Sequence, residues 1–325
     1  MRTRRSQSSG DPVSSSFGKA QSKSKTHTPV LLHEAVELLA LKSNDVVLDA
    51  TLGGAGHARA IAEKLGKKGV FIGFDLDSDA IPRAEHALQG MKPSAYLVHA
   101  NFRHLADELR KLKVSSVTKV LFDLGWSAYQ LNSGRGFSLL ADEPLLMTYD
   151  KPKADQLTAE RIVNEWGEES LADIIFGWGE ERYSRRIAKA VVEHRVKQPF
   201  KTAKELAEVI KEAVPAFYRR GRPGRSGLHP ATRTFQALRI AVNDELGALK
   251  EGLHAAWEML TPEGRIAVIT FHSIEDRLVK QTFAEWKKNG EGILLSKKPI
   301  GPTAEEVREN PRARSAKLRI IEKVI

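Results

Sequence analysis

The sequence predicts an α/β fold, an open and mostly parallel sheet interrupted by an inserted all-helical domain. Three observations lead to this prediction. Short apolar runs alternate with helical patterns between residues 46 and 123, which is typical of a doubly wound sheet. Each of these runs ends near a polar residue. The next such run begins only at Arg265, about 140 residues later; because a crossover between parallel strands needs roughly 30 residues, we expect a separate domain in the gap.

These patterns divide the chain into three parts. Residues 1–25 are polar and basic, with Asp11 as the single acid, and we expect a disordered extension there. The α/β domain is expected to be discontinuous, formed by residues 26–130 and 231–325, and the helical insertion is expected to cover residues 131–230. The extension lacks the amphipathic apolar face of an organellar transit peptide, so we favour a cytoplasmic location.

The composition excludes several classes of protein. The 325 residues include 51 Lys and Arg against 41 Asp and Glu, a formal net charge of +10, which favours a polyanionic partner such as nucleic acid. Cysteine is absent, which excludes disulfides, cysteine-bound metals and any cysteine nucleophile, including one that attacks a pyrimidine ring carbon. The sequence has no apolar run of about 18 residues, so we expect no transmembrane helix and no membrane partner.

The first two predicted strands frame a glycine-rich turn. Residues 46–48 lead into Asp49 and the turn, a helical pattern follows, and residues 70–74 then deliver Asp75. Glycines at such a turn let the backbone approach a ligand closely, and an acid about 20 residues further on can accept the hydroxyl groups of a ribose. The layout is therefore typical of a nucleotide-type cofactor site.

Two ligand classes use this layout. A dinucleotide site requires Gly-x-Gly-x-x-Gly, because the pyrophosphate lies on the helix N-terminus and the third glycine lets helix and strand pack tightly. Here Gly54 and Gly56 are followed by Arg59 where the third glycine would stand. S-adenosylmethionine carries a positive sulfonium and an amino-acid end, which suit carboxylates such as Asp49 and Asp75. We favour S-adenosylmethionine and keep a nicotinamide-dependent oxidoreductase as an alternative.

The third and fourth predicted strands also end near polar residues. Residues 95–99 lead to Asn101 and Phe102; Asn101 is expected at the edge of the adenine and Phe102 over its face, with ordinary core packing of Phe102 as the alternative. Residues 119–122 lead to Asp123. Because the carboxyl ends of parallel strands form the ligand crevice of a doubly wound sheet, these side chains are predicted to converge with the acids of the first two strands.

The inserted segment is predicted to be helical. Its patterns favour helices over residues 157–166, 171–176, 182–194 and 204–214, the last opened by the capping box Thr202-x-x-Glu205. A segment rich in arginine, glycine and aromatic residues follows, and we predict that it contacts RNA. The RNA-binding candidates in and beyond it are Arg219, Arg220, Arg222, Arg225 and Arg233.

The chain then returns to the sheet. One long helix is predicted from residue 229 to about residue 260, followed by a fifth strand at residues 265–271 and a second capping box, Ser273-x-x-Asp276. Two last strands, residues 293–295 and 317–323, complete the predicted sheet.

Several blocks of the chain together resemble one family. They are Asp49-Ala50-Thr51-x-Gly53-Gly54-x-Gly56-His57, Asp123-Leu124-Gly125-x-Ser127, Arg135-Gly136-Phe137-Ser138, Gly179-Glu180-Glu181-Arg182, His229-Pro230-Ala231-Thr232-Arg233-Thr234-Phe235, Phe271-His272-Ser273-x-Glu275-Asp276-Arg277 and Asn310-Pro311-Arg312-Ala313-Arg314-Ser315. The pattern is similar to that of the bacterial small-subunit ribosomal RNA cytosine-N4 methyltransferases of the RsmH/MraW type, in order over residues 26–325.

The resemblance implies a Rossmann-like class I methyltransferase sheet with an inserted helical domain, and S-adenosylmethionine as the methyl donor. The implied acceptor is a cytosine in the decoding centre of 16S rRNA, within the small ribosomal subunit. The family's cofactor positions map onto Ala55, Gly56, His57, Asp75, Phe102, Asp123 and Gln130. These agree with the prediction from the strand ends and the glycine turn, which adds Asp49, Gly54 and Asn101.

The chain departs from the family pattern in two places. Residues 126–132 replace the usual Val-Ser-Ser-Pro-Gln-Leu-Asp, and residues 144–150 read Pro-Leu-Leu-Met-Thr-Tyr-Asp where Pro-Leu-Asp-Met-Arg-Met-Asp is usual. An acid and an arginine are therefore missing where the acceptor base is expected. This leaves a second hypothesis, an RNA-binding ribosome-assembly factor with weakened or lost methyl transfer.

The chemistry suggests which residues act. The exocyclic nitrogen of cytosine is a poor nucleophile, so the enzyme must align it with the donor and accept a hydrogen bond as positive charge develops on the amine; no metal is required. The predicted catalytic residues are Asp123, Ser127 and His272, with Asp123 as the acceptor or, alternatively, as the partner of the methionine amino group. Trp126 or Tyr129 is expected to stack on a flipped-out cytosine. A homodimer remains possible.

Overall fold

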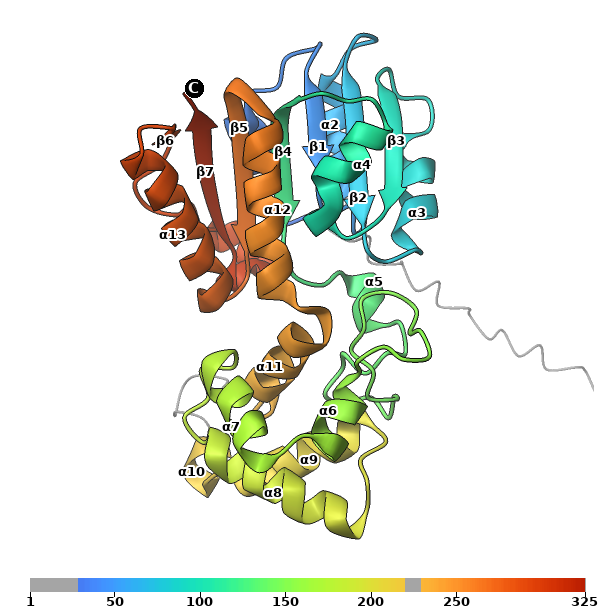
Figure 1. Ribbon diagram of the computed structural model, residues 1–325, viewed down its shortest axis with the longest axis vertical. Coiled ribbons are helices and arrows are strands. Elements are labelled where there is room, and N and C mark those ends of the chain that lie inside the picture. Colours follow the sequence, from blue (N-terminus) through green and yellow to red (C-terminus); the bar gives the residue numbers. More distant parts are fainter. Residues whose placement is uncertain (1–28, 220–228, 325) are drawn as a thin grey trace, which may run out of the picture.

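The computed structural model describes residues 29–219 and 229–324. Three of the predicted RNA-binding residues, Arg220, Arg222 and Arg225, lie outside these ranges, as does the predicted extension, residues 1–25. In the part that is described, a sheet with helices on both faces lies beside a helical domain (Figure 1). The predicted fold class is confirmed.

The sheet has seven strands in the order β3-β2-β1-β4-β5-β7-β6. The strands are β1 (Val46–Asp49), β2 (Val70–Asp75), β3 (Ser94–His99), β4 (Val117–Asp123), β5 (Leu260–Thr270), β6 (Gly292–Leu294) and β7 (Lys317–Lys323). Strands β1 to β5 are parallel, whereas β7 runs antiparallel to both β5 and β6. The carboxyl ends of the first five strands therefore meet at one edge of the sheet.

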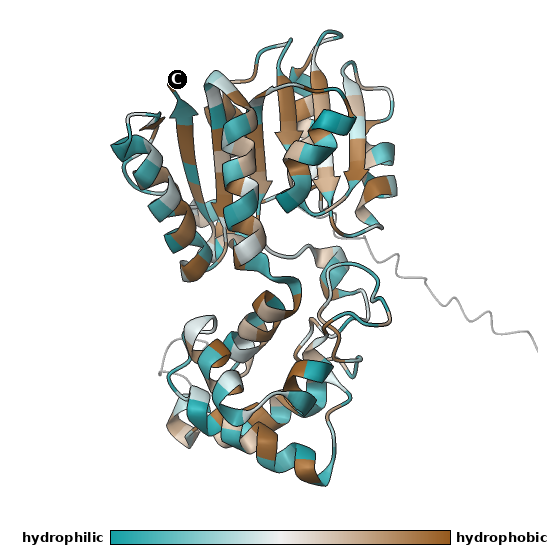
Figure 2. Cartoon of the chain, viewed as in Figure 1, coloured by the Kyte–Doolittle hydropathy of each residue, from teal (hydrophilic) through white to brown (hydrophobic). Residues whose placement is uncertain are grey.

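The sheet is buried on both faces. Successive side chains point to opposite faces of a strand, and Val47 and Leu48 accordingly belong to different apolar clusters. One face is covered by α1 (Leu32–Leu39), α2 (Gly56–Lys64) and α3 (Ala80–Leu88), and the other by α4 (Leu105–Lys111), α12 (Glu245–Met259) and α13 (Ser273–Lys288). Burial on both sides explains why the central strands read as continuous apolar runs (Figure 2).

The helical domain has an apolar core of its own. Its helices are α6 (Ala159–Glu165), α7 (Glu168–Gly177), α8 (Ser184–Lys197), α9 (Ala203–Ala213), α10 (Ala216–Arg219) and α11 (Thr232–Asn243). The predicted capping box of α9 is present, with the Thr202 side chain and Glu205 bonded to each other's backbone amides. Phe235, Leu238 and Val242 of α11 also belong to this core. The bounds of the insertion, residues 131–230, remain a prediction.

The predicted long helix after residue 229 is two helices. Asp244 adopts a left-handed conformation, with φ 46°, and ends α11 where α12 begins. Its carboxylate accepts a hydrogen bond from Arg103 Nη2 at 2.5 Å. A Cβ on Gly247 would lie 2.5 Å from that carboxylate, so a larger residue there would require the Asp244 side chain to move. The break between α11 and α12 is thus stabilised by Arg103, which is distant in the sequence. The apolar periodicity continues from one helix into the next and therefore did not reveal it.

Two sets of contacts fasten the insertion to the carboxyl edge of the sheet. In the turn before α8, Glu180 accepts hydrogen bonds from Ser273 Oγ and Arg277 Nη2, both at 2.6 Å. In the loop after α5 (Ala128–Leu131), Arg135 Nη2 donates to Asp77 Oδ2 at 3.1 Å. The insertion is therefore held next to the strand ends.

Among the described residues, no helix combines the length and apolarity that a membrane span requires. The remaining short elements are α14 (Ala304–Glu309) and two 3₁₀ turns, η1 (Phe102–His104) and η2 (Pro311–Ser315).

Gly73 of β2 gives a test of how tightly the turn after β1 is packed on the sheet. A Cβ at Gly73 would lie 2.4 Å from Leu52 Cδ2, and Leu52 is buried. We expect Gly73→Ala to lower the free energy of unfolding by about 1–3 kcal/mol, because overpacking displaces buried side chains. Urea denaturation measures this. Gly177→Ala is the control, since no atom lies within 4 Å of its added Cβ; equal stability of the two variants would contradict the packing described.

Candidate active site at the carboxyl edge of the sheet

Three strands end in carboxylates at the same edge. Asp49, Asp75 and Asp123 are the last residues of β1, β2 and β4. The register brings them together, because Asp49 is paired with Gly73 on one side and with Leu121 on the other. The predicted convergence of these three strand ends is therefore confirmed.

Asp49 is the most deeply placed of the three. Its side chain is fully buried, and Oδ1 accepts a hydrogen bond from the Thr51 amide at 3.1 Å. Its Oδ2 is buried and has no hydrogen-bond partner in the described part of the chain. Burial raises the pKa of Asp49 to about 7.

His57, the second residue of α2, lies against Asp123. Its Nδ1 is 3.3 Å from Asp123 Oδ2, while His57 Nε2 and Asp123 Oδ1 are buried and have no hydrogen-bond partner among the described residues. Burial acts to lower the pKa of His57, but the hydrogen bond and the charge of Asp123 outweigh it, so that the pKa is raised. Thr51 Oγ1 accepts the Asp123 amide at 2.7 Å and so ties β4 to the turn after β1.

Asp75 connects the glycine turn to the end of β2. Its two oxygens accept hydrogen bonds from the backbone amides of Gly53, at 2.7 Å, and Asp77, at 2.8 Å. Burial raises the pKa of Asp75 to about 6. Each carboxylate oxygen has two lone pairs, so both can still accept a further hydrogen bond, as a ribose diol would require.

The turn itself is shaped by close approach. Gly53 and Ala55 have positive φ, 48° and 61°, and the turn ends at the N-terminus of α2. A Cβ on Gly56 would lie 2.1 Å from Pro29 Cγ, so only glycine lets the segment before α1 pack there. Gly54 lies between these positions. The turn therefore exposes backbone rather than side chains next to the acids.

The charges of this site do not balance. Three buried or half-buried carboxylates share one imidazole, and no lysine or arginine of the described residues forms an ion pair with Asp49, Asp75 or Asp123. Uncompensated buried charge is unfavourable. The unpaired oxygens of Asp49 and Asp123 fit a cationic ligand, and the ammonium and sulfonium groups of S-adenosylmethionine meet that requirement.

The residues predicted to contact adenine have packing roles of their own. Asn101 Oδ1 accepts a hydrogen bond from the Arg103 amide at 3.0 Å and caps η1. Phe102 is half-buried, with its ring edge-on to Phe122 at 5.5 Å and in contact with Gly252 of α12. Their contacts with adenine remain predictions.

Ser127 and Gln130 form a capping box. The Gln130 amide donates to Ser127 Oγ at 3.2 Å and the Ser127 amide donates to Gln130 Oε1 at 2.8 Å, which opens α5. This capping explains both residues without a ligand. The predicted catalytic role of Ser127 and the predicted cofactor contact of Gln130 remain untested.

The predicted capping box of α13 is placed one residue too late. The cap is His272, whose Nδ1 accepts the Glu275 amide at 3.4 Å, because β5 ends at Thr270 rather than Phe271. Ser273 instead bonds Glu180, and Asp276 pairs with Lys317 and Arg319 of β7. His272 therefore has a capping role, and its predicted catalytic role remains a prediction.

The aromatic residues after β4 both lie against arginines. The guanidinium of Arg312 is 5.4 Å from the Trp126 ring, and that of Arg83 is 4.4 Å from the Tyr129 ring. Trp126 is 36% exposed. Of the predicted RNA-binding arginines that are described, Arg219 is exposed at the end of α10, and Arg233 donates to the Glu180 carbonyl at 2.8 Å.

The segment that departs from the family pattern is held inside the joint between the domains. Tyr149 Oη donates to Glu245 Oε1 at 3.0 Å, and Arg239 binds both oxygens of Glu245. Burial raises the pKa of Tyr149 well above its usual value. Thr148 is fully buried and donates to the Asp150 carbonyl at 2.8 Å. Thr148 and Tyr149, two of the residues that differ from the family pattern, therefore have hydrogen-bond partners within the protein.

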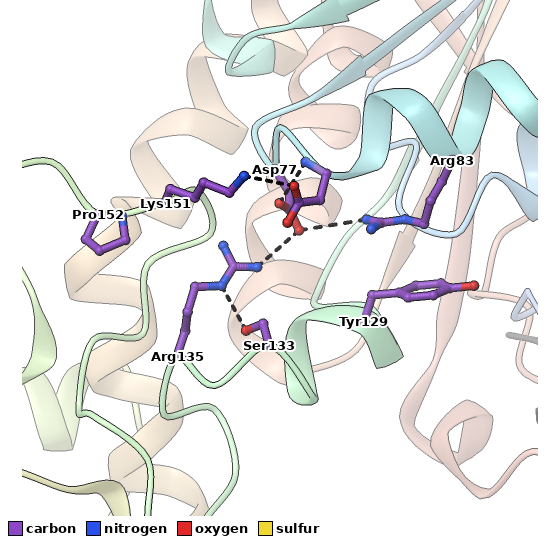
Figure 3. Close-up of a pocket in the computed structure, with 8 residues that line it drawn as sticks. Asp77, Arg83, Tyr129, Ser133, Arg135, Lys151 and Pro152 are labelled. Atoms are coloured by element: carbon purple, nitrogen blue, oxygen red, sulfur yellow. Dashed lines mark hydrogen bonds and ion pairs between the residues drawn. The ribbon is translucent and has the colours of Figure 1, made fainter.

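A cavity of about 300 Å³ adjoins the cofactor edge, and sequence reasoning missed it. Figure 3 shows Arg135 and Arg83 reaching toward Asp77 from opposite sides, with Tyr129 below. Lys151 Nζ pairs with Asp79 Oδ1 at 3.1 Å across the same cavity. Neither Asp49 nor Asp123 lines it, so it lies beside the acids rather than among them. The one feature of the sequence that could have indicated this cavity is the block beginning at Arg135, which is part of the family resemblance.

An open sheet of this strand order, with a glycine turn after β1 and acids at the strand ends, defines a class I S-adenosylmethionine-dependent methyltransferase. The sequence profile described as the MraW methylase family matches residues 24–324. The chain belongs to that family.

Two relatives and one solved structure show the extent of the similarity. The chain is 47% identical over 314 residues to ribosomal RNA small subunit methyltransferase H of Brevibacillus brevis, covering 92% of this chain and 98% of the relative. It is 45% identical to the protein of the same name from Symbiobacterium thermophilum, covering 92% and 96%. The crystal structure of an rRNA methylase from Streptococcus thermophilus aligns with a TM-score of 0.44 and 11% identity, over 90% of this chain and 96% of that one.

The raised pKa values predict how stability depends on pH. The folded protein holds protons on Asp49, Asp75 and His57 more tightly than the unfolded chain does, so their contribution to stability is present at low pH. It is lost as pH rises through the raised pKa of each group, about 6 for Asp75 and about 7 for Asp49, and above the usual imidazole pKa for His57. We expect Asp49→Asn to stabilise the cofactor-free protein by a few kcal/mol (roughly 1–4) near pH 8 and to change it little near pH 5. Urea denaturation of both proteins at both pH values measures this; a loss of stability near pH 8 would contradict the charge imbalance.

Proposed function

We propose that the protein transfers the methyl group of S-adenosylmethionine to the exocyclic N4 of a cytosine in the decoding centre of 16S rRNA. One observation carries the proposal: a buried, unpaired carboxylate oxygen of Asp123 lies at the end of β4, next to acids that call for a cationic donor. Support for the RNA substrate comes from the relatives, which are named ribosomal RNA small subunit methyltransferase H.

Each acid has a separate task in this proposal. Asp75 accepts the ribose hydroxyls, and Asp49 balances the cationic end of the donor. When bound, S-adenosylmethionine supplies a methyl group on a positively charged sulfur. Asp123 Oδ1 accepts a hydrogen bond from the cytosine amine as positive charge develops there, while His57 holds Oδ2 and fixes the orientation of the carboxylate. An Asp123 that instead holds the methionine amino group remains the alternative.

The acceptor RNA would be held by the insertion and by the loop after β4. Trp126 is partly exposed and has the Arg312 guanidinium 5.4 Å from its ring centroid, an arrangement suited to binding an unstacked base. Arg219 and Arg233 supply positive charge on the insertion side. We further propose that the substrate is the RNA within the small ribosomal subunit; a homodimer and a cytoplasmic location remain predictions.

The assembly-factor hypothesis rests on one observation, the loss of an acid and an arginine at Leu146 and Thr148. Thr148 is buried and bonded within its own loop, so it does not supply the positive charge that an arginine would place there. In this second function the protein would bind cofactor and RNA without transferring the methyl group.

Labelled methyl transfer to small subunits that lack the modification tests both functions. We expect wild-type protein to label the RNA and nuclease digestion to yield N4-methylcytidine. Asp123→Asn should lower kcat by about 10²–10³, as expected when one preorganised acceptor is removed. Asp107→Asn is the control, because Asp107 is an exposed acid on α4 whose one ion pair in the described part of the chain is with Arg110. Cofactor binding by wild-type protein without any labelling would favour the assembly factor.

A further inference from the structure

An arginine and three aromatic rings form a compact surface feature on the insertion. The guanidinium carbon of Arg182 lies 4.7 Å from the ring centroid of Tyr183, 5.2 Å from that of Tyr218 and 6.0 Å from that of Phe217. Tyr183 and Tyr218 meet edge to face with centroids 5.0 Å apart. Phe217 is 65% exposed. We call these four residues the Arg182 platform.

The platform is fixed from below by a buried acid. Glu181 is fully buried; its Oε2 accepts the Tyr218 hydroxyl at 2.6 Å and its Oε1 accepts the Tyr183 amide at 2.9 Å. Burial and this hydrogen bond raise the pKa of Tyr218 to about 12, so the hydroxyl remains a donor. The short helix α10 is thereby anchored to the start of α8, and the Tyr218 ring is held in place before any ligand arrives.

The surroundings of the platform are positively charged. Arg185 and Arg186, in the first turn of α8, and Arg219 of α10 are exposed. Within the described ranges, neither these three arginines nor Arg182 forms an ion pair. Positive charges at a helix N-terminus oppose the helix dipole and cost stability. Their placement is therefore better explained by an anionic ligand than by the stability of α8.

The platform lies next to the carboxyl edge of the sheet. Glu180, two residues before Arg182, accepts hydrogen bonds from Ser273 and Arg277 in the first turns of α13, the helix that follows β5. Figure 1 shows α7 on the side of the insertion toward α13, with α10 farther from the sheet. The turn that contains Glu180 therefore connects the platform to the edge at which β5 ends.

We propose that the Arg182 platform binds an unpaired segment of the substrate RNA, with bases stacked on its rings and guanidinium and phosphates held by the flanking arginines. The proposal rests on the proposed function, since it assigns a second contact of the same RNA. Aromatic faces and planar guanidinium groups stack on bases of any sequence, whereas paired bases have no free face. The platform therefore selects single-stranded RNA near the target nucleotide.

Binding of a short, unstructured, fluorescently labelled RNA, measured by anisotropy over a range of salt concentrations, tests the platform. We expect Arg182→Ala and Phe217→Ala each to weaken binding roughly 10-fold, as the loss of one base stack does. Arg182→Lys keeps the charge but loses the planar group, so it should weaken binding with an unchanged salt slope. Arg185→Ala should reduce the slope by about 1, as loss of a phosphate contact does.

The control is Arg161→Ala, because Arg161 is an exposed arginine of the same domain that is paired with Glu165 on α6. It should bind RNA as wild type does. Unchanged S-adenosylmethionine affinity of every variant, measured by calorimetry, shows that the cofactor domain is intact, and an unchanged thermal unfolding curve shows the same for the insertion. If Arg182→Lys binds RNA as tightly as wild type, the stacking role of Arg182 is wrong. If Arg182→Ala and Phe217→Ala both bind RNA as tightly as the control, the whole platform proposal is wrong, and this face is left to a protein partner.

The outcomes separate the platform from the proposed function. If wild-type protein methylates small subunits but the platform variants bind RNA normally, the platform is wrong and the function stands. If the platform variants lose RNA binding but wild-type protein transfers no methyl group, the platform stands and the assembly-factor hypothesis replaces the enzyme.

Discussion

The shortage of positive charge around Asp49, Asp75 and Asp123 is the constraint on which the rest of the site depends. Parallel strands force their carboxyl ends to one edge, and here three of those ends carry an acid. Within the described ranges, the one ion pair that any of them makes is between Asp123 and His57, while the charge of Arg83 acts on Asp75 without forming an ion pair. The ligand-free site is therefore electrostatically unfavourable, and a ligand with positive charge relieves it. The same property explains why Asp49 is expected to favour binding of a cationic cofactor and yet to destabilise the cofactor-free protein.

The surrounding structure keeps these acids in place. Thr51 bonds the backbone of β4 and its own amide reaches Asp49, while Asp75 holds the glycine turn through Gly53. The insertion is fastened to the same edge at two places. An RNA bound to the insertion, as proposed above, would therefore lie close to the acids at the strand ends.

The features that follow from local pattern were predicted from the sequence. The strand ends at Asp49, Asp75 and Asp123 were found because apolar runs mark buried parallel strands, and the cap at Thr202 was found because its motif is local. The break at Asp244 was missed because a distant residue, Arg103, stabilises it. The cap at His272 was displaced by one residue because apolar Phe271 extended the predicted strand beyond its last ladder pair. Ser127 and Gln130 accept hydrogen bonds from each other's backbone amides, and no pattern of single residues indicated this capping box.

The most direct measurement of the central claim is the number of protons exchanged when the cofactor binds. Calorimetric titration near pH 6.5, in two buffers with different ionisation enthalpies, gives this number for S-adenosylmethionine and for S-adenosylhomocysteine, which lacks the sulfonium charge. The charge imbalance predicts proton release on binding the cation, less release with the neutral thioether, and a reduced release in Asp49→Asn. Equal proton exchange for both ligands, or none, would contradict it.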